Sequence, residues 1–127
     1  MEQKEMTGKV IGGAMQVYNY LGNGFQEVIY QRALAIEFRD RHIEFQREFS
    51  MPIFYKGEQV GTRRVDFLVE GDIMLELKAV IQLQDVHLAQ AKNYLEAYRV
   101  RTGLLINFGA AGGLQFKRLF NNKQRPG

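Results

Sequence analysis

Hydrophobic residues in the first third of the chain recur at the spacing of helices. From Thr7, which is placed to cap a first helix, apolar positions return every three or four residues as far as Leu21, and Gly22 follows. A second helix is predicted over residues 25–41, and its apolar residues lie on more than one side. We therefore expect the second helix to be covered on two sides.

The middle and the end of the chain carry the pattern of strands. Segments rich in β-branched and aromatic residues are separated by turns at Gly57 and Gly71, which predicts an antiparallel meander. Asp85 is placed to cap a third helix, and a nearly all-apolar strand follows, of the kind that is buried on both faces. The predicted elements of this part are 45–55, 59–69, 73–80, helix 86–98, 102–108 and 114–120.

The composition is that of a folded domain with a core of its own. The chain has 127 residues, 46% of them hydrophobic, and we expect one domain over residues 1–120 with a flexible tail over 121–127. A net charge of +3 is compatible with binding to a phosphate backbone without requiring it. The lack of cysteine excludes disulfides and thiolate metal sites, and no apolar stretch is long enough for a membrane span. A cytoplasmic protein with no membrane partner is predicted.

Two charged residues interrupt the apolar segment 73–80. Glu76 and Lys78 are two residues apart, so on a strand they point to the same face. A three-residue loop centred on Gly71 would set Asp66 opposite Glu76, whereas a two-residue loop would shift that register by one. Two carboxylates so close repel each other unless a cation lies between them. The three charges therefore suggest a site for Mg²⁺ or Mn²⁺, at which Lys78 could activate water.

A purely structural role would explain the same three charges. Asp66, Glu76 and Lys78 could form a structural salt bridge across an exposed sheet face, which is common in antiparallel sheets. The spacing alone leaves both interpretations open.

The spacing of the charges resembles the signature of the PD-(D/E)XK nuclease superfamily. Asp66, a gap of nine residues and then Glu76-Leu77-Lys78 match it, while Val65 stands where the signature has proline. That departure touches no metal ligand. As an isolated motif this match is weak, and its weight depends on what accompanies it.

More of the chain resembles the bacterial and archaeal GxxExxY family. Its naming pattern is matched by Gly24, Glu27 and Tyr30, and the likeness runs from about residue 7 to residue 119. The other matching stretches are 64–67, 76–80, 87–95, 103–109 and 117–118. In this order the motifs are specific, and they identify the chain as similar to a branch of the same superfamily.

The resemblance implies an α/β (α+β) fold with a restriction-endonuclease-like core, in which helices flank a mixed central sheet. It also implies that Glu27, on the first core helix, completes a metal shell formed by Asp66 and Glu76. Judged from the residues alone, Glu27 can instead be a first-turn glutamate that favours the helix dipole.

A polar row is expected on one face of the third predicted helix. His87, Gln90 and Tyr94 share that face, and the Gln-x-x-x-Tyr part resembles a motif of RecB-like exonucleases. The likeness implies that these residues help to position nucleic acid; a core-rim tyrosine with a bonded glutamine and a surface histidine is the alternative. Arg64 lies two residues before Asp66 and is expected on its face, paired with a carboxylate or touching a phosphate.

We expect a metal-dependent nuclease that hydrolyses phosphodiester bonds, with DNA favoured over RNA as its substrate. The alternative is a catalytically silent module of the same fold that binds nucleic acid or protein, since resemblance fixes fold better than activity. A third interpretation is that the acidic cluster only stabilises the fold and has no part in binding or catalysis. Because 127 residues barely exceed a nuclease core, any sequence specificity would come from a partner or from a homodimer.

Overall fold

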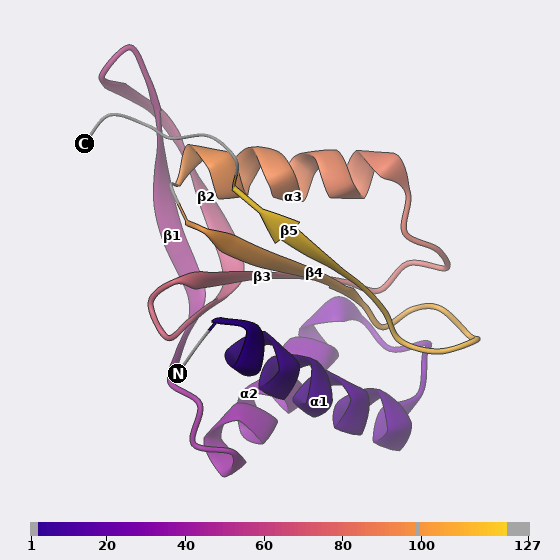
Figure 1. Cartoon of the computed structure of the whole chain (residues 1–127). Coiled ribbons are helices and arrows are strands. Elements are labelled where there is room, and N and C mark those ends of the chain that lie inside the picture. The colour runs from indigo at the N-terminus through magenta and orange to yellow at the C-terminus, as the bar shows by residue number, and fades with distance from the viewer. Residues whose placement is uncertain (1–2, 99, 122–127) are drawn as a thin grey trace.

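A five-stranded mixed sheet, with strand order β1-β2-β3-β4-β5, forms the centre of the computed structural model (Figure 1). The structure describes residues 3–98 and 100–121. Its helices and strands are α1 (Gln3–Leu21), α2 (Glu27–Asp40), β1 (Phe45–Tyr55), β2 (Glu58–Val69), β3 (Ile73–Lys78), α3 (Asp85–Ala97), β4 (Thr102–Asn107) and β5 (Gln115–Phe120).

The strand directions follow from the connections. Short turns join β1 to β2 and β2 to β3, a longer loop over residues 108–114 joins β4 to β5, and all three pairs are antiparallel. β3 and β4 are parallel, because α3 lies between them in the chain and carries it back across the sheet. The expected mixed sheet with flanking helices is confirmed.

Several predicted boundaries were wrong by a few residues. The first helix begins at Gln3, so Thr7 lies inside it and donates from Oγ1 to the carbonyl of Lys4. The third helix has Gln84 at its N-cap, and Asp85 is its first residue. Asn121, assigned to the tail, donates its backbone N–H to the carbonyl of Arg101, and residues 122–127 lie outside the described part of the chain.

Helices cover the two faces of the sheet unequally. α1 and α2 lie together on one face, and α3 lies on the other (Figure 1). The larger apolar cluster fills the space under α1 and α2, and it includes Tyr30, Phe38 and Phe67. A smaller cluster, which includes Met74 and Leu95, lies under α3. Among the described residues, no helix combines the length and the apolarity needed to cross a bilayer.

β2 changes the face that its side chains occupy part-way along its length. Phe67 and Val69 pack in the cluster under α1 and α2, whereas Val65 and Leu68, three residues apart, both pack in the cluster under α3. Strict alternation along a strand would put residues three apart on opposite faces. The regular pattern is therefore broken around Asp66, and this break decides which side chains reach the site.

Candidate functional site

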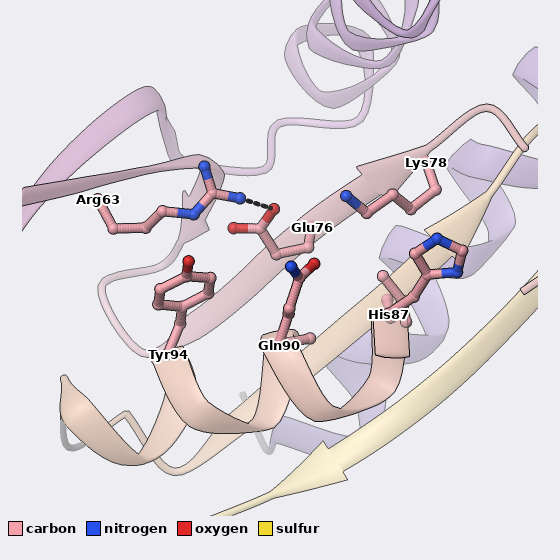
Figure 2. Close-up of a pocket in the computed structure, with 8 residues that line it drawn as sticks. Arg63, Glu76, Lys78, His87, Gln90 and Tyr94 are labelled. Atoms are coloured by element: carbon pink, nitrogen blue, oxygen red, sulfur yellow. Dashed lines mark hydrogen bonds and ion pairs between the residues drawn. The ribbon is translucent and has the colours of Figure 1, made fainter. Parts of the chain in front are cut away.

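Residues from β2, β3 and α3 form a small pocket on the α3 face of the sheet. Figure 2 shows Glu76 and Lys78 on β3 pointing toward α3, which carries His87, Gln90 and Tyr94 on successive turns. Five of the residues expected at the site from the sequence thus line one pocket. The apolar residues that line the pocket are Ala91, from α3, and Leu105, from β4. Arg63, from β2, is the remaining lining residue.

Glu76 is buried and only partly neutralised. It is 4% exposed, and its Oε2 accepts a hydrogen bond from Nη2 of Arg63 at 3.3 Å. Its other oxygen, Oε1, is buried without a hydrogen-bond partner. Burial, followed by the charge of Asp66, raises the pKa of Glu76 from the ordinary 4.5 to about 8, against the lowering effect of Arg63 and Lys78. The site therefore disfavours a bare carboxylate here and would gain from a cation.

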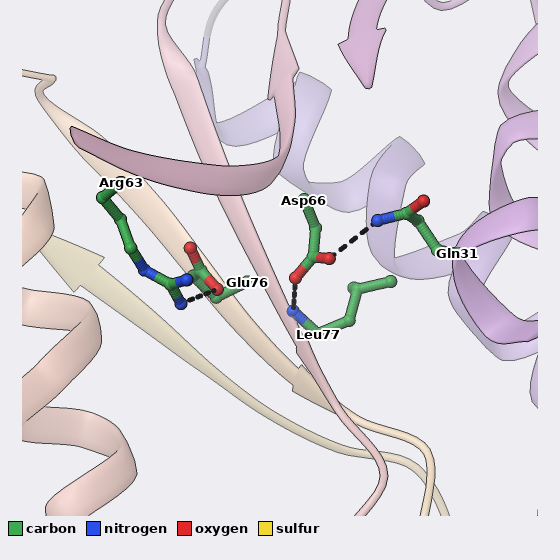
Figure 3. Close-up of polar contacts among 5 residues, drawn as sticks. All are labelled: Gln31, Arg63, Asp66, Glu76 and Leu77. Carbon is green, nitrogen blue, oxygen red and sulfur yellow. Dashed lines mark hydrogen bonds and ion pairs between the residues drawn. The ribbon is translucent and has the colours of Figure 1, made fainter. Parts of the chain in front are cut away.

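Asp66 lies where the ladder between β2 and β3 ends. Oδ2 of Asp66 accepts the backbone N–H of Leu77 at 2.8 Å, and Oδ1 accepts Nε2 of Gln31, from α2, at 2.8 Å (Figure 3). The side chain thus takes up an N–H that would otherwise extend the ladder past the pair Phe67–Leu75. Two donors fix the orientation of the carboxylate.

The register between β2 and β3 is the one expected for a three-residue loop, but the ladder ends before Asp66 and Glu76 and the two carboxylates meet different partners. The ladder pairs Phe67 with Leu75 and Val69 with Ile73. Figure 3 shows Asp66 turned toward Gln31 while Glu76 meets Arg63. The expected cross-strand pair of Asp66 with Glu76 is therefore not formed, because the Asp66 side chain accepts the N–H of Leu77 where the ladder would continue.

Glu27 is held near the same charges by a fixed loop. It is the first residue of α2, and burial, followed by the charge of Asp66, raises its pKa, while Lys78 and Arg63 lower it. One turn further on, the Tyr30 hydroxyl donates to the carbonyl of Gly22 at 2.6 Å and accepts the N–H of Phe25 at 3.2 Å. The spacing of the Gly-x-x-Glu-x-x-Tyr pattern therefore has a physical reason, since the tyrosine fixes the loop that precedes the glutamate.

The row on α3 divides into two parts. His87 Nδ1 accepts the backbone N–H of Gln84 at 3.0 Å, which stabilises the start of the helix. At the other end of the row, the Arg63 guanidinium lies 4.7 Å from the centre of the Tyr94 ring, a cation–π distance. The ring of Tyr98 stacks on Tyr94 at 6.3 Å. Gln90 lies between these parts and lines the pocket.

Arg63 occupies the place that the sequence assigned to its neighbour. Arg64 pairs with Glu48 at 3.6 Å, and both side chains are largely exposed. Arg64 thus pairs with a carboxylate, as one of its two expected roles had it, but it does not line the pocket, and Arg63 reaches Glu76 instead. Glu48 has a φ of 53°, a strained value for this residue, and lies opposite Asp66 in the ladder that pairs β1 with β2. The regular alternation of side chains along a strand could not predict the role of Arg63, since no local sequence signal marks the point where β2 departs from that alternation.

Asn107 is a second residue whose contribution the sequence did not reveal. It is fully buried, accepts the N–H of Val80 at 2.9 Å, and donates to the carbonyl of Val80 at 2.9 Å and to Gln115 at 3.0 Å. These bonds fix the chain just after Lys78, the strand partner of Asn107. Gly109 supports the same junction, because a Cβ there would meet the carbonyl oxygen of Val80 at 2.4 Å.

The carboxylates fit a hard divalent ion that takes few protein ligands. Within residues 3–98 and 100–121, no three histidine, aspartate or glutamate side chains come close enough together for a complete ligand set. Mg²⁺ needs only one or two carboxylates, because water and phosphate oxygens supply the rest. Glu76 offers an unpartnered oxygen, and Asp66 uses two of about four lone-pair positions. A two-carboxylate site is therefore compatible with this geometry.

The chain belongs to the PD-(D/E)XK nuclease superfamily, whose family model matches residues 4–119. Among solved structures, the crystal structure of SSO0001 is similar, with a TM-score of 0.58 and 16% sequence identity. That match covers 76% of this chain and 50% of the other, so this chain spans about half the length of its structural relative. At such identity the likeness shows the fold alone. No curated protein sequence matches the chain.

Proposed function

We propose that this chain is a metal-dependent nuclease that hydrolyses phosphodiester bonds. The observation that carries the proposal is the buried Oε1 of Glu76, which has no partner although Lys78 and Asp66 lie nearby. An unpartnered buried carboxylate oxygen is costly, and it is tolerated most readily where a ligand supplies the missing contact. Superfamily membership supports a ligand that belongs to nuclease chemistry.

Each residue has a role that its position favours. Glu76 and Asp66 would hold Mg²⁺ or Mn²⁺, and Glu27 would support the ion or its water from the first turn of α2. A bound divalent ion would supply Lewis-acid stabilisation and a more acidic water. Lys78 lies on the same strand face as Glu76, where it can orient the attacking water and offset charge on the phosphate. Gln90, Tyr94 and His87 would contact the nucleic acid along α3.

The finer assignments are also part of the proposal. Membership of the GxxExxY branch is supported by the Gly24, Glu27 and Tyr30 pattern and by the fixed loop before Glu27. DNA is the favoured substrate, and a homodimer is the simplest source of sequence specificity. A silent binding module of the same fold is the alternative. It is favoured by the fact that the described residues form no three-ligand metal cluster.

The test is cleavage of labelled single-stranded and double-stranded DNA and RNA with Mg²⁺, Mn²⁺ or EDTA. Cutting should need the metal, and both Glu76→Gln and Lys78→Met should lower its rate by about 100-fold or more. Matched controls make the same chemical changes on exposed positions, Glu58→Gln and Lys92→Met, and should cut at the wild-type rate.

Two results would count against the nuclease. Cutting that persists in EDTA, or in both site variants, would indicate a contaminating enzyme. Binding to nucleic acid without any cutting, and with equal affinity in EDTA and in Glu76→Gln, would establish the silent module instead.

A further inference from the structure

Arg63 is the one arginine among the described residues that line the pocket, and its contacts there are incomplete. Its side chain is about one-third exposed, with Nη2 on Glu76 at 3.3 Å and the guanidinium 4.7 Å from the Tyr94 ring centre. Its Nε is buried without a hydrogen-bond partner. Figure 2 shows the guanidinium between the carboxylate of Glu76 and the ring of Tyr94. The group is thus held in place by a ring while at least one donor stays unused.

The pair between Arg63 and Glu76 is a loose one. A charge-assisted N–H···O bond usually measures about 2.7–2.9 Å, and arginine commonly binds a carboxylate through two parallel bonds. Here one bond of 3.3 Å is formed, and Glu76 Oε1 and Arg63 Nε are both left without partners. Such a pair costs little to separate once each group has a better partner.

The unused atoms of the two residues call for different ligands. Glu76 Oε1 needs a cation or a donor, whereas Arg63 Nε needs an acceptor. A divalent ion with a phosphate bound to it satisfies both, because the ion takes the carboxylate and the phosphate oxygens take the guanidinium. The planar guanidinium matches the geometry of phosphate oxygens, and an aromatic face can hold it in place meanwhile.

We propose that Arg63, resting on Tyr94, is the phosphate-binding residue of this site and exchanges Glu76 for a nucleic-acid phosphate when the ion binds. This inference rests on the proposed nuclease function and assigns a role within it. In the metal-free protein Arg63 donates a hydrogen bond to Glu76. With metal and substrate bound, it keeps its place on the ring and contacts the backbone next to the metal.

Binding can be measured separately from cutting with fluorescein-labelled single-stranded DNA, by fluorescence anisotropy, in Ca²⁺ instead of Mg²⁺. Gels run on the same samples check that the strand stays intact. Arg63→Met should weaken binding about tenfold and flatten the plot of log Kd against log salt by about 0.7, the value for one phosphate contact to a single strand. Arg63→Lys keeps the charge, so it should retain the salt slope while losing part of the affinity.

Two comparisons test whether the loss of binding comes from the position of Arg63, and not from the loss of any positive charge or from a change in packing. Arg64→Met removes the same charge from the exposed neighbour that pairs with Glu48, and it should cost less affinity and slope than Arg63→Met. Tyr94→Leu should weaken binding more than Tyr94→Phe, because only phenylalanine keeps a ring beneath the guanidinium. Thermal melting of each variant shows that it is folded.

The outcomes are distinct. Equal losses in Arg63→Met and Arg64→Met, or wild-type binding by a folded Arg63→Met, would overturn the role of Arg63 and leave the nuclease intact. If the wild-type protein binds neither DNA nor RNA with Ca²⁺ or Mg²⁺, the nucleic-acid site fails, and the inference fails with it.

Discussion

The two faces of the sheet differ in what they bury. Beneath α1 and α2 lies an extensive apolar cluster, in which the polar hydroxyl of Tyr30 finds two hydrogen-bond partners. Beneath α3 the apolar cluster is smaller, and beside it Glu76 and Arg63 keep buried polar atoms without partners. One face therefore supplies stability, whereas the other carries the unsatisfied groups expected of a ligand site.

A single strand serves both faces. Leu75 and Leu77 of β3 point into the large cluster, while the alternate residues Glu76 and Lys78 point into the pocket. This division makes the position of the charges depend on the packing of the leucines. Substitutions on the two faces should consequently differ in kind, with losses of stability on one and losses of function on the other.

The largest effect on stability is expected for Phe38→Ala. Phe38 is fully buried and packs edge-on against Phe67 and at a tilt against Phe45, so truncation leaves a cavity and should cost about 3–5 kcal/mol of unfolding free energy. Urea denaturation measures it. Phe54→Ala, on an exposed ring of β1, should change stability by no more than about 0.5 kcal/mol. Equal losses in both variants would remove the distinction between core and surface that this comparison assumes.

An effect of intermediate size on stability is expected for Glu76→Gln, which should stabilise the protein where Phe38→Ala destabilises it. Burial raises the pKa of Glu76 to about 8, so between pH 4.5 and 8 the folded protein holds a proton that the unfolded chain releases. The contribution of Glu76 to the free energy of unfolding is therefore fully present below about pH 4.5. It is lost as the pH rises through about 8, where the folded protein must hold a buried negative charge. In EDTA at pH 8.5, Glu76→Gln should exceed the wild type by about 1–3 kcal/mol, with little difference near pH 4.5.

Urea unfolding at several pH values in EDTA tests this expectation, with Glu58→Gln, at the exposed first residue of β2, as the control. Mg²⁺ or Mn²⁺ should raise the melting temperature of the wild type at pH 8.5 and leave that of Glu76→Gln nearly unchanged. Parallel pH profiles for wild type and Glu76→Gln would show that the buried carboxylate is already neutralised by the protein.

The smallest effect on stability is expected for Tyr30→Phe. Losing the hydroxyl leaves the carbonyl of Gly22 and the N–H of Phe25 without this partner, at a cost of about 0.5–1.5 kcal/mol. The ring still stacks on Phe108, so the core stays filled. If the loop orients Glu27, metal affinity measured by calorimetry should fall as well. Tyr55→Phe, at an exposed position, is the control, and a loss confined to stability would separate Tyr30 from the site.

The sequence predicted most of the architecture because local patterns determined it. The helical spacing before Leu21, the turn at Gly71 and the apolar strand Thr102–Asn107 each follow from side-chain periodicity and turn chemistry. The same local reasoning left two registers between β2 and β3, and the structure has the one of the three-residue loop. It also placed Glu76 and Lys78 on one face, since a strand alternates over so short a distance.

What the sequence by itself determined is the order of the elements, the superfamily and the pair of charges on β3. Only the tertiary structure decided that Arg63, and not Arg64, meets Glu76, and that Asp66 turns to Gln31 and Leu77. The reason is physical: the break in alternation along β2 comes from pairing with a strained β1 and from hydrogen bonds to residues distant in sequence. Such contacts form only after the helices and strands have packed together, so no local pattern records them.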